Sequence, residues 1–276
     1  MIFFDQCDVI VNGTGILAKQ ASLSTANSLA PIKILGHRGI LTQSPERDLT
    51  STLQLSYFLE TDNEPNFAIV EDIKGFFLKD EVYSPKQIVI GGVSGEYYLN
   101  GYSIRALPNE AITATASYLN FGGVSGSFIQ KDPTIIYNKS NGDNIGAFVI
   151  ITDTGNYATN KSLSFEYQFA CNWKPINVIG QRKQVDVKLI SAEETISVER
   201  EIFNNVSFSG NRASSTLFES NESGSIKIHG FKFACDKQAS QLGSGISLSG
   251  FRINQAEVSV SIDSFITNKV TFNKYY

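Results

Sequence analysis

Few side chains in this sequence have the types and spacing that catalysis or metal binding requires. The two histidines, His37 and His229, lie far apart, and neither stands beside a serine or cysteine nucleophile motif. An active site needs several converging groups, and a zinc site needs ligands at characteristic spacings. We therefore expect no catalytic residue, no metal ligand and no bound cofactor.

Two pairs of carboxylates offer a second possible chemistry. Glu193 and Glu194 are adjacent, and Glu199 and Glu201 are separated by one residue. Two carboxylates on either side of a glycosidic bond are the catalytic groups of most glycosidases. Alternate residues of a strand share one face, however. We expect Glu199 and Glu201 to lie together on a solvent-exposed face, so a hydrolase remains only a third hypothesis.

A glycine-rich pentapeptide, GGVSG, occurs at residues 91–95 and again at residues 122–126. Neither copy is followed by Lys-Ser/Thr or by the start of a helix, so we predict turns or bulges and not a phosphate loop. Residues 138–144 (NKSNGDN) lack the order of acidic residues that a calcium loop requires. Cys7, Cys171 and Cys235 are too widely spaced for a zinc site or a disulfide framework and are expected to be buried thiols.

Several aromatic residues could form a platform for a sugar ring, namely Tyr97, Tyr98, Tyr167, Phe169 and Trp173. Packing in the core or at an interface is the more common role of such side chains, and it is our expectation here.

The composition indicates a protein of strands and turns. Ile, Val, Thr, Phe and Tyr are abundant, with 22 glycines and one methionine, and the formal net charge is −4. An acidic balance without clusters of Lys and Arg argues against a nucleic-acid clamp. The first residues, MIFFDQCD, lack a basic segment, and no stretch has transmembrane length, so we expect a soluble chain without a signal peptide.

The strongest pattern is an internal repeat. Val9–Ser24 (VIVNGTGILAKQASLS) and Val149–Ser164 (VIITDTGNYATNKSLS) match at eight of sixteen positions without a gap, where chance gives roughly one. Four extra residues follow in the second copy, and then Pro31–Arg38 (PIKILGHR) is answered by Pro175–Arg182 (PINVIGQR). Self-similarity at a fixed offset predicts duplicated architecture. We predict two tandem β domains, residues 1–140 and 145–276, with a linker or arm over residues 122–146.

Alternating hydrophobicity predicts most of the strands. In the first half these cover about residues 49–59, 87–92, 96–104 and 110–121; in the second half they cover about 162–170, 184–190 and 194–203, followed by two closing segments. One helix is expected at Phe67–Leu78, with Asn66 as its N-cap. The closing segment LSGFRI (248–253) parallels LNGYSI (99–104), and residues 257–265 parallel residues 111–121, although GSIKIHGF (224–231) is a rival for the first match.

The order of these segments resembles the tail tube proteins of tailed bacteriophages and related contractile injection systems. The resemblance rests on NGTGILAKQASLS (12–24), NSLAPIKILG (27–36), a long strand pair with one flanking helix, and the closing segment LNGYSIRALPNEAITATASY (99–118). It implies two tail-tube-like β-barrel or sandwich domains with the helix in the first. It also implies edge-to-edge rings, trimeric with pseudo-sixfold symmetry or hexameric, which stack through long hairpins or loops.

The expected function is therefore mechanical, with no catalysis. The chain would be a structural virion protein of the tail, assembled in the host cytoplasm, either of the tube that conducts DNA or of a ring that joins the tube to the baseplate. Its partners would be other copies of itself and neighbouring tail, baseplate or sheath proteins. DNA would pass without specific binding along a polar or acidic wall. The alternative is a carbohydrate-binding β-sandwich of an adhesin or distal-tail module.

Overall fold

The structure is a computed structural model of the 276-residue chain. It describes residues 8–16, 18–26, 29–36, 38–40, 42–45, 49–59, 65–77, 83–107, 110, 112–128, 150–153, 162–179, 184–201, 224–233, 239–260 and 267–276. The predicted turn at Pro108–Asn109, the linker centre, His37, Cys7, Cys235 and residues 138–144 lie outside these ranges.

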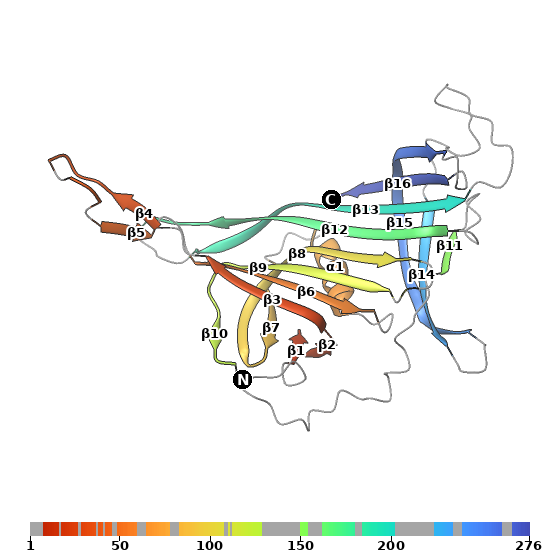
Figure 1. Ribbon diagram of the computed structural model, residues 1–276, viewed down its shortest axis with the longest axis horizontal. Coiled ribbons are helices and arrows are strands. Elements are labelled where there is room, and N and C mark those ends of the chain that lie inside the picture. The colour runs from red at the N-terminus through yellow and green to blue at the C-terminus, as the bar shows by residue number, and fades with distance from the viewer. Residues whose placement is uncertain are drawn as a thin grey trace.

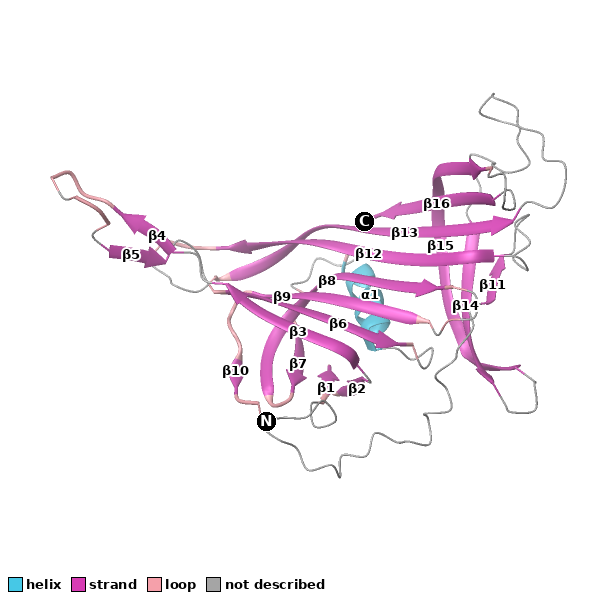
Figure 2. Cartoon of the chain, viewed as in Figure 1, coloured by secondary structure: helices cyan, strands magenta, loops and turns pink. Residues whose placement is uncertain are grey.

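The described part of the chain contains sixteen strands and one helix, so the prediction of a mainly β protein is confirmed (Figure 2). The first half contains β1 (Val9–Val11), β2 (Thr14–Ile16), β3 (Ala18–Ala26), β4 (Leu29–Ile32), β5 (Thr42–Pro45), β6 (Thr50–Phe58), α1 (Pro65–Phe76), β7 (Lys86–Ile90), β8 (Val93–Ala106), β9 (Thr113–Asn120) and β10 (Ser125–Gly126). The second half contains β11 (Ile150–Asp153), β12 (Ser162–Ile176), β13 (Asp186–Glu201), β14 (Gly224–Phe233), β15 (Ala239–Ser259) and β16 (Thr267–Tyr275).

Fourteen strands form one antiparallel sheet that runs through both halves of the chain. Its central strands follow one another in the order β16, β13, β12, β8, β9, β6, β3 (Figure 1). Among the described strands the sheet is open and does not close as a barrel, because β3 pairs with β6 alone. The two halves therefore share a sheet, and β8 and β12 are the strands that join them.

Strand β8 belongs to two parts of the sheet at once. Its first residues, Val93–Tyr97, pair with β7, and Tyr98–Arg105 pair with β9, with an irregularity at Asn100. β7, β1 and β2 turn away from the central strands (Figure 1). Side chains from both parts meet in one core cluster, which includes Val11, Ile88, Leu53, Leu55 and Ile104.

Helix α1 covers the junction of the two halves. It begins at Pro65 and ends at Phe76, two residues before the predicted range at each end, and proline is well suited to the first helical position. The Phe67 ring lies 6.3 Å from that of Tyr102 on β8 and 6.1 Å from that of Tyr167 on β12. The helix thus packs against strands of both halves.

Asn66 is not the N-cap that the sequence suggested. It lies inside the helix and is fully buried, where its amide nitrogen donates to the Tyr57 hydroxyl and its oxygen accepts from the Tyr118 hydroxyl. A buried amide needs such partners, and these two tyrosines come from strands β6 and β9. The residue anchors the start of α1 to the sheet.

The pairing pattern is the same in both halves. The first half has the order β1-β7-β8-β9-β6-β3, and the second has β11-β14-β15-β16-β13-β12. In each order the opening strand is followed by a hairpin, which is β7 and β8 in the first half and β14 and β15 in the second. One more strand follows, and then the two strands of a long hairpin, β6 and β3 or β13 and β12. The two halves thus resemble each other in the order of their hydrogen-bonded strands as well as in sequence.

Irregular pairs align the halves residue by residue. β3 is irregular between Ala18 and Gln20, and β12 is irregular between Ser162 and Ser164. Ala18 and Ser162 each lie just before the irregularity of their strand, so we match these two residues and call this a match by pairing position. The same offset matches Pro31 with Pro175. The four extra residues therefore enter before β12, and the sequence match of Ser22 with Ser162 is displaced by four residues.

Near the end of each half, β8 is irregular between Leu99 and Gly101, and β15 is irregular between Ile253 and Gln255. Asn100 thus corresponds to Asn254. This correspondence lies five residues away from the predicted parallel between residues 99–104 and 248–253, which stays a prediction, and β16 has the place in the strand order that β9 has in the first half. In addition, the predicted strands 184–190 and 194–203 are one continuous strand, β13.

Strand β6 provides a test of this two-faced sheet. Leu53 is completely buried, whereas its neighbour Gln54 is exposed on the opposite face. We expect Leu53→Ala to lower the free energy of unfolding by about 2–5 kcal/mol, because it leaves a cavity. Gln54→Ala is the matched control and should change it by less than about 0.5 kcal/mol. Urea denaturation followed by fluorescence measures both; equal costs would contradict the assignment of faces.

Candidate assembly surfaces

One face of the central sheet is lined by small polar side chains. A row of directly paired residues runs across five strands through Ser22, Gln54, Ser117, Gly101 and Ala170. The next row contains Gln20, Ser56, Thr115, Ser103, Gln168 and Thr195. The Ser103 hydroxyl donates to the Thr115 hydroxyl at 3.2 Å. The opposite face carries the core side chains, so this surface is a smooth, uncharged strip.

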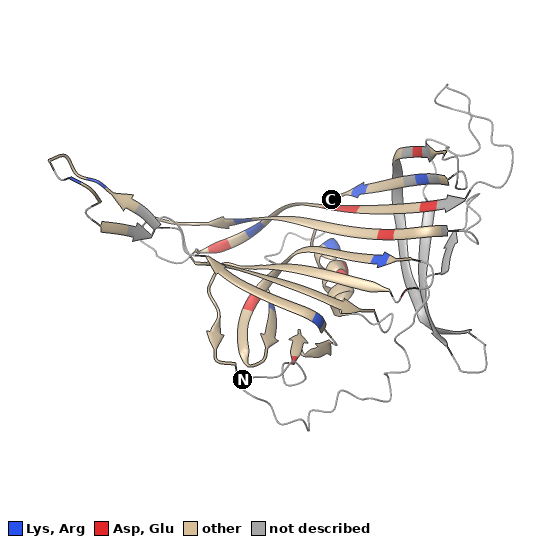
Figure 3. Cartoon of the chain, viewed as in Figure 1, with Lys and Arg blue, Asp and Glu red and all other residues tan. Residues whose placement is uncertain are grey.

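Charges of both signs border the strip (Figure 3). On β12, β13 and β15 the polar face carries Glu166, Glu193, Glu199 and Glu257, and the cations beside them are Arg105 and Lys269. Lys174 and Lys188 pair farther out, where β12 and β13 project beyond the sheet. The face therefore has an uncharged centre and an acidic excess along its border.

Two strand segments at the limits of the sheet have one edge without a partner strand among the described residues. β3 pairs only with β6, and the last part of β15, Arg252–Ser259, pairs only with β16. By strand order, β12 corresponds to β3, and β8 corresponds to β15. In the interior of the sheet β12 and β8 pair with each other, from the pair Phe165 and Ala106 to the pair Ala170 and Gly101. Free edges present unpaired N–H and C=O groups to a neighbouring chain.

Two hairpin arms project from the sheet. The first arm is formed by β4 and β5, and the second is formed by the outer parts of β12 and β13 (Figure 1). Leu35 and Ile179 are completely exposed at their tips, with values of 103% and 104%. Other large exposed apolar residues of the arms are Ile32, Ile34, Ile40, Val178, Val185 and Ile190. Exposed apolar patches are common on surfaces that contact another protein.

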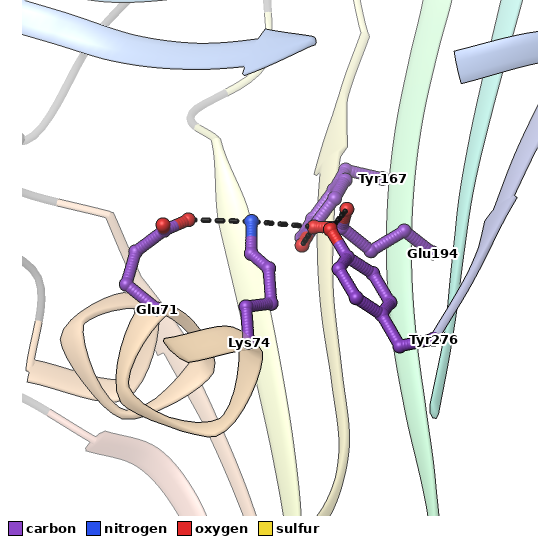
Figure 4. Close-up of polar contacts among 5 residues, drawn as sticks. All are labelled: Glu71, Lys74, Tyr167, Glu194 and Tyr276. Carbon is purple, nitrogen blue, oxygen red and sulfur yellow. Dashed lines mark hydrogen bonds and ion pairs between the residues drawn. The ribbon is translucent and has the colours of Figure 1, made fainter. Parts of the chain in front are cut away.

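A buried network fastens α1 to the second half of the chain (Figure 4). Lys74 on the helix donates to Glu194 on β13 at 2.7 Å, and it also contacts Glu71 at 2.5 Å. The hydroxyls of Tyr167 and Tyr276 donate to the two oxygens of Glu194 at 2.6 and 2.7 Å. Glu194 is 1% exposed, so the network provides its charge with three partners away from solvent.

The electrostatics of this network are those of a structural contact. Burial, together with Glu194, raises the pKa of the Tyr167 hydroxyl far above its usual value, and the same two causes raise the pKa of Tyr276. Both hydroxyls therefore keep their protons at neutral pH and continue to donate. Each oxygen of Glu194 has a hydrogen-bond donor, which leaves the carboxylate poorly suited to act as a base or nucleophile.

The structure separates the carboxylates that sequence analysis grouped. Glu194 lies in the core, whereas Glu193 lies on the polar face and accepts from Asn273 at 2.9 Å. Glu199 accepts from the Ser164 hydroxyl at 3.2 Å. The side chain of Glu201 lies outside the description, so its predicted position beside Glu199 stays a prediction. His229 is placed only by its backbone, which pairs with Ile150.

The two GGVSG segments meet each other in space. Gly91 and Gly92 form the two-residue turn between β7 and β8, which confirms the predicted turn, and both have positive φ angles. Ser125 and Gly126 of the second copy form β10, and this strand pairs with Ser94 and Val93 of the first copy. The pair is a strand contact within the sheet.

Packing is confirmed for most of the aromatic residues and for one cysteine. Tyr97, Tyr167, Phe169 and Trp173 are buried, and the Trp173 indole donates to the Leu99 carbonyl oxygen at 2.7 Å. Tyr98 is half-buried and lies 5.0 Å from Trp173 between ring centres. Cys171 is a buried free thiol. These side chains are not a surface platform.

Sequence analysis missed the Lys74–Glu194 contact. The two residues are 120 positions apart, and no local pattern joins them. A weak signal existed, because Glu194 occupies a position that alternates with Ile196 and Val198 on the apolar face of β13. A carboxylate at such a position requires a buried partner.

Comparison with models of known protein families gives no match, and comparison with curated proteins gives none either. Within the described residues, no helix has the length and apolar character needed to cross a bilayer. The same residues contain no group of three or more His, Cys, Asp or Glu side chains placed to hold a metal ion.

The buried ion pair makes a quantitative prediction. Lys74→Met should lower the free energy of unfolding by about 3–5 kcal/mol, because the charge of Glu194 then stays buried without its cation. The double variant Lys74→Met/Glu194→Gln should recover part of this loss. Glu71→Gln is the control and should cost less than about 1 kcal/mol, since Glu71 is half exposed. Urea denaturation of the three variants decides; equal costs for Lys74→Met and Glu71→Gln would contradict the network.

Proposed function

We propose that this chain is a structural protein of a phage-type tail tube, in which two-domain subunits join edge to edge into rings that surround a channel. A ring at the junction of tube and baseplate is built in the same way and belongs to the same proposal. The role is mechanical, and it uses the strand edges, the polar face and the arms of the chain.

The observation that carries the proposal is the junction of β8 and β12. The first half offers a β8 edge to the second half, and the second half has the same type of edge on β15. Strand β3 of a neighbouring chain would pair with this edge of β15, because β3 has the same place in the first half as β12 has in the second. A head-to-tail contact of this kind, repeated by rotation, closes a ring.

The internal junction supplies the register of the proposed contact. By pairing position, Ala21 corresponds to Phe165 and Val260 corresponds to Ala106, which are partners in the interior. Ala21 of one chain would then face Val260 of the next, and Ser22 would face Ser259. Val260 is 72% exposed in the single chain, and this register gives its apolar side chain a partner. Three chains would supply six similar units.

The polar face fits the wall of a channel for DNA. Hydroxyl and amide groups interact weakly with phosphates, whereas a wall of Lys and Arg would bind DNA through counterion release and slow its passage. An acidic excess adds repulsion. With the sheet curved around an axis, this face would point inward while α1 and the core lie outside.

Cysteine cross-linking tests the register. We expect Ser22→Cys/Ser259→Cys to give disulfide-linked dimers and closed trimers on a non-reducing gel, because the proposed pairing brings these two positions together between chains. The mismatched pair Ser22→Cys/Gln255→Cys and both single variants are the controls. Equal cross-linking in the matched and mismatched pairs would refute the register.

A charge at the free edge tests ring formation itself. Val260→Asp should leave the single chain folded, because the side chain is exposed there, and should shift the mass measured by light scattering from ring to monomer. Thr115→Asp, on the exposed polar face, should retain the ring. A wild-type chain that stays monomeric at high concentration, or an unchanged mass for Val260→Asp, would count against the proposal.

A further inference from the structure

A polar cleft lies in the first half of the chain, where the turn between β12 and β13 meets it. Its volume is about 430 Å³, and its walls include Gln87, Glu96, Tyr98, Phe121, Ser125 and Gln184. Tyr98 and Phe121 contact each other at 5.9 Å between ring centres and form an aromatic wall. Gln184 belongs to the turn between β12 and β13, so two distant segments of the chain meet here.

The cleft offers hydrogen-bond acceptors and negative charge. The side-chain oxygen of Gln184 is buried and has no hydrogen-bond partner. Among the described residues of the lining, Glu96 is the one that carries a charge. Burial, then the negative charges of Asp186 and Glu96, raise the pKa of the Tyr98 hydroxyl. An acceptor-rich site with aromatic walls suits a cation.

The first arm carries the complementary groups. Its described tip contains Lys33 and Arg38, both exposed, and no acidic residue occurs in the described residues 29–45. Ile34 and Leu35 beside them are exposed and apolar. The tip thus combines a positive charge with an apolar surface, and the cleft combines a negative charge with aromatic rings.

We infer that the cleft is a receptor for a guanidinium or ammonium group, and that its occupant is the first arm of a second copy of this chain. Lys33 or Arg38 would lie over the Tyr98 or Phe121 ring, donate to the free oxygen of Gln184 and pair with Glu96. This contact links one ring to the next, and it therefore rests on the proposed function. It assigns a specific partner to each arm tip.

Charge exchange in the full-length chain tests the partner. Lys33→Glu/Arg38→Glu and Glu96→Lys should each give rings that do not stack in electron micrographs and that sediment as single rings. The triple variant Lys33→Glu/Arg38→Glu/Glu96→Lys should restore part of the stacking, because the ion pair forms again with its charges exchanged while the contacts with the rings and with Gln184 stay lost. Glu110→Lys, which reverses an exposed charge outside the cleft, is the matched control and should stack like the wild type. Stacking in the two charge-reversed variants, or no recovery in the triple variant, would overturn the inference.

A small-molecule titration tests the cleft without any ring. Agmatine, which carries a guanidinium group, should change the tyrosine and tryptophan fluorescence in a saturable way, and Glu96→Gln should weaken its binding roughly tenfold. Glucose serves as the neutral probe. If glucose binds and agmatine does not, the cleft is a sugar site and the inference is wrong. If agmatine binds but rings never form, the cleft has the proposed chemistry while the proposed function and the arm as its occupant both fail.

Discussion

The hydrogen bonding of β8 along both edges is the constraint on which the rest of this structure depends. Between Gly101 and Arg105, β9 occupies one edge and β12 occupies the other. A strand in this position has no unpaired backbone groups, which are costly when buried. The second half of the chain is needed to provide that second partner. The first half alone would expose the β8 edge, in the way that the described part of β15 exposes its own.

The junction is strengthened by side chains on its core face. Phe67 packs against rings from both halves, and Lys74 joins the helix to β13. A buried ion pair gains little net stability over an apolar pair of the same shape, since both charges lose their hydration. Its benefit is specificity. By pairing position, Ser51 on β6 of the first half corresponds to Glu194 on β13. Strand β6 therefore has no carboxylate at this position, and Lys74 can form this ion pair only with β13.

The two arms differ in their tip residues while the strand order of the two halves is the same. Leu35 and Ile179 are exposed at equivalent positions of the two tips, after the matched Pro31 and Pro175. The position of Lys33, however, corresponds to Asn177 in the second arm. The strand order depends on the ladder of hydrogen bonds, whereas the described tip residues are exposed, and exposed loop residues tolerate change more readily.

The sequence by itself determined the β class, the helix to within two residues, and the alternation of buried and exposed residues along β6 and β9. These features depend on local periodicity, which alternation along a strand or a helical turn encodes directly. It could not determine the register of the closing strands, because the irregular pairs at Asn100 and Asn254 depend on a partner strand. It also misjudged Asn66, since only the approach of Tyr57 and Tyr118 makes a buried amide favourable inside a helix. The partners of Glu194, the cleft and the edges without a partner strand among the described residues were decided by the tertiary structure, because each depends on residues that are distant in the chain.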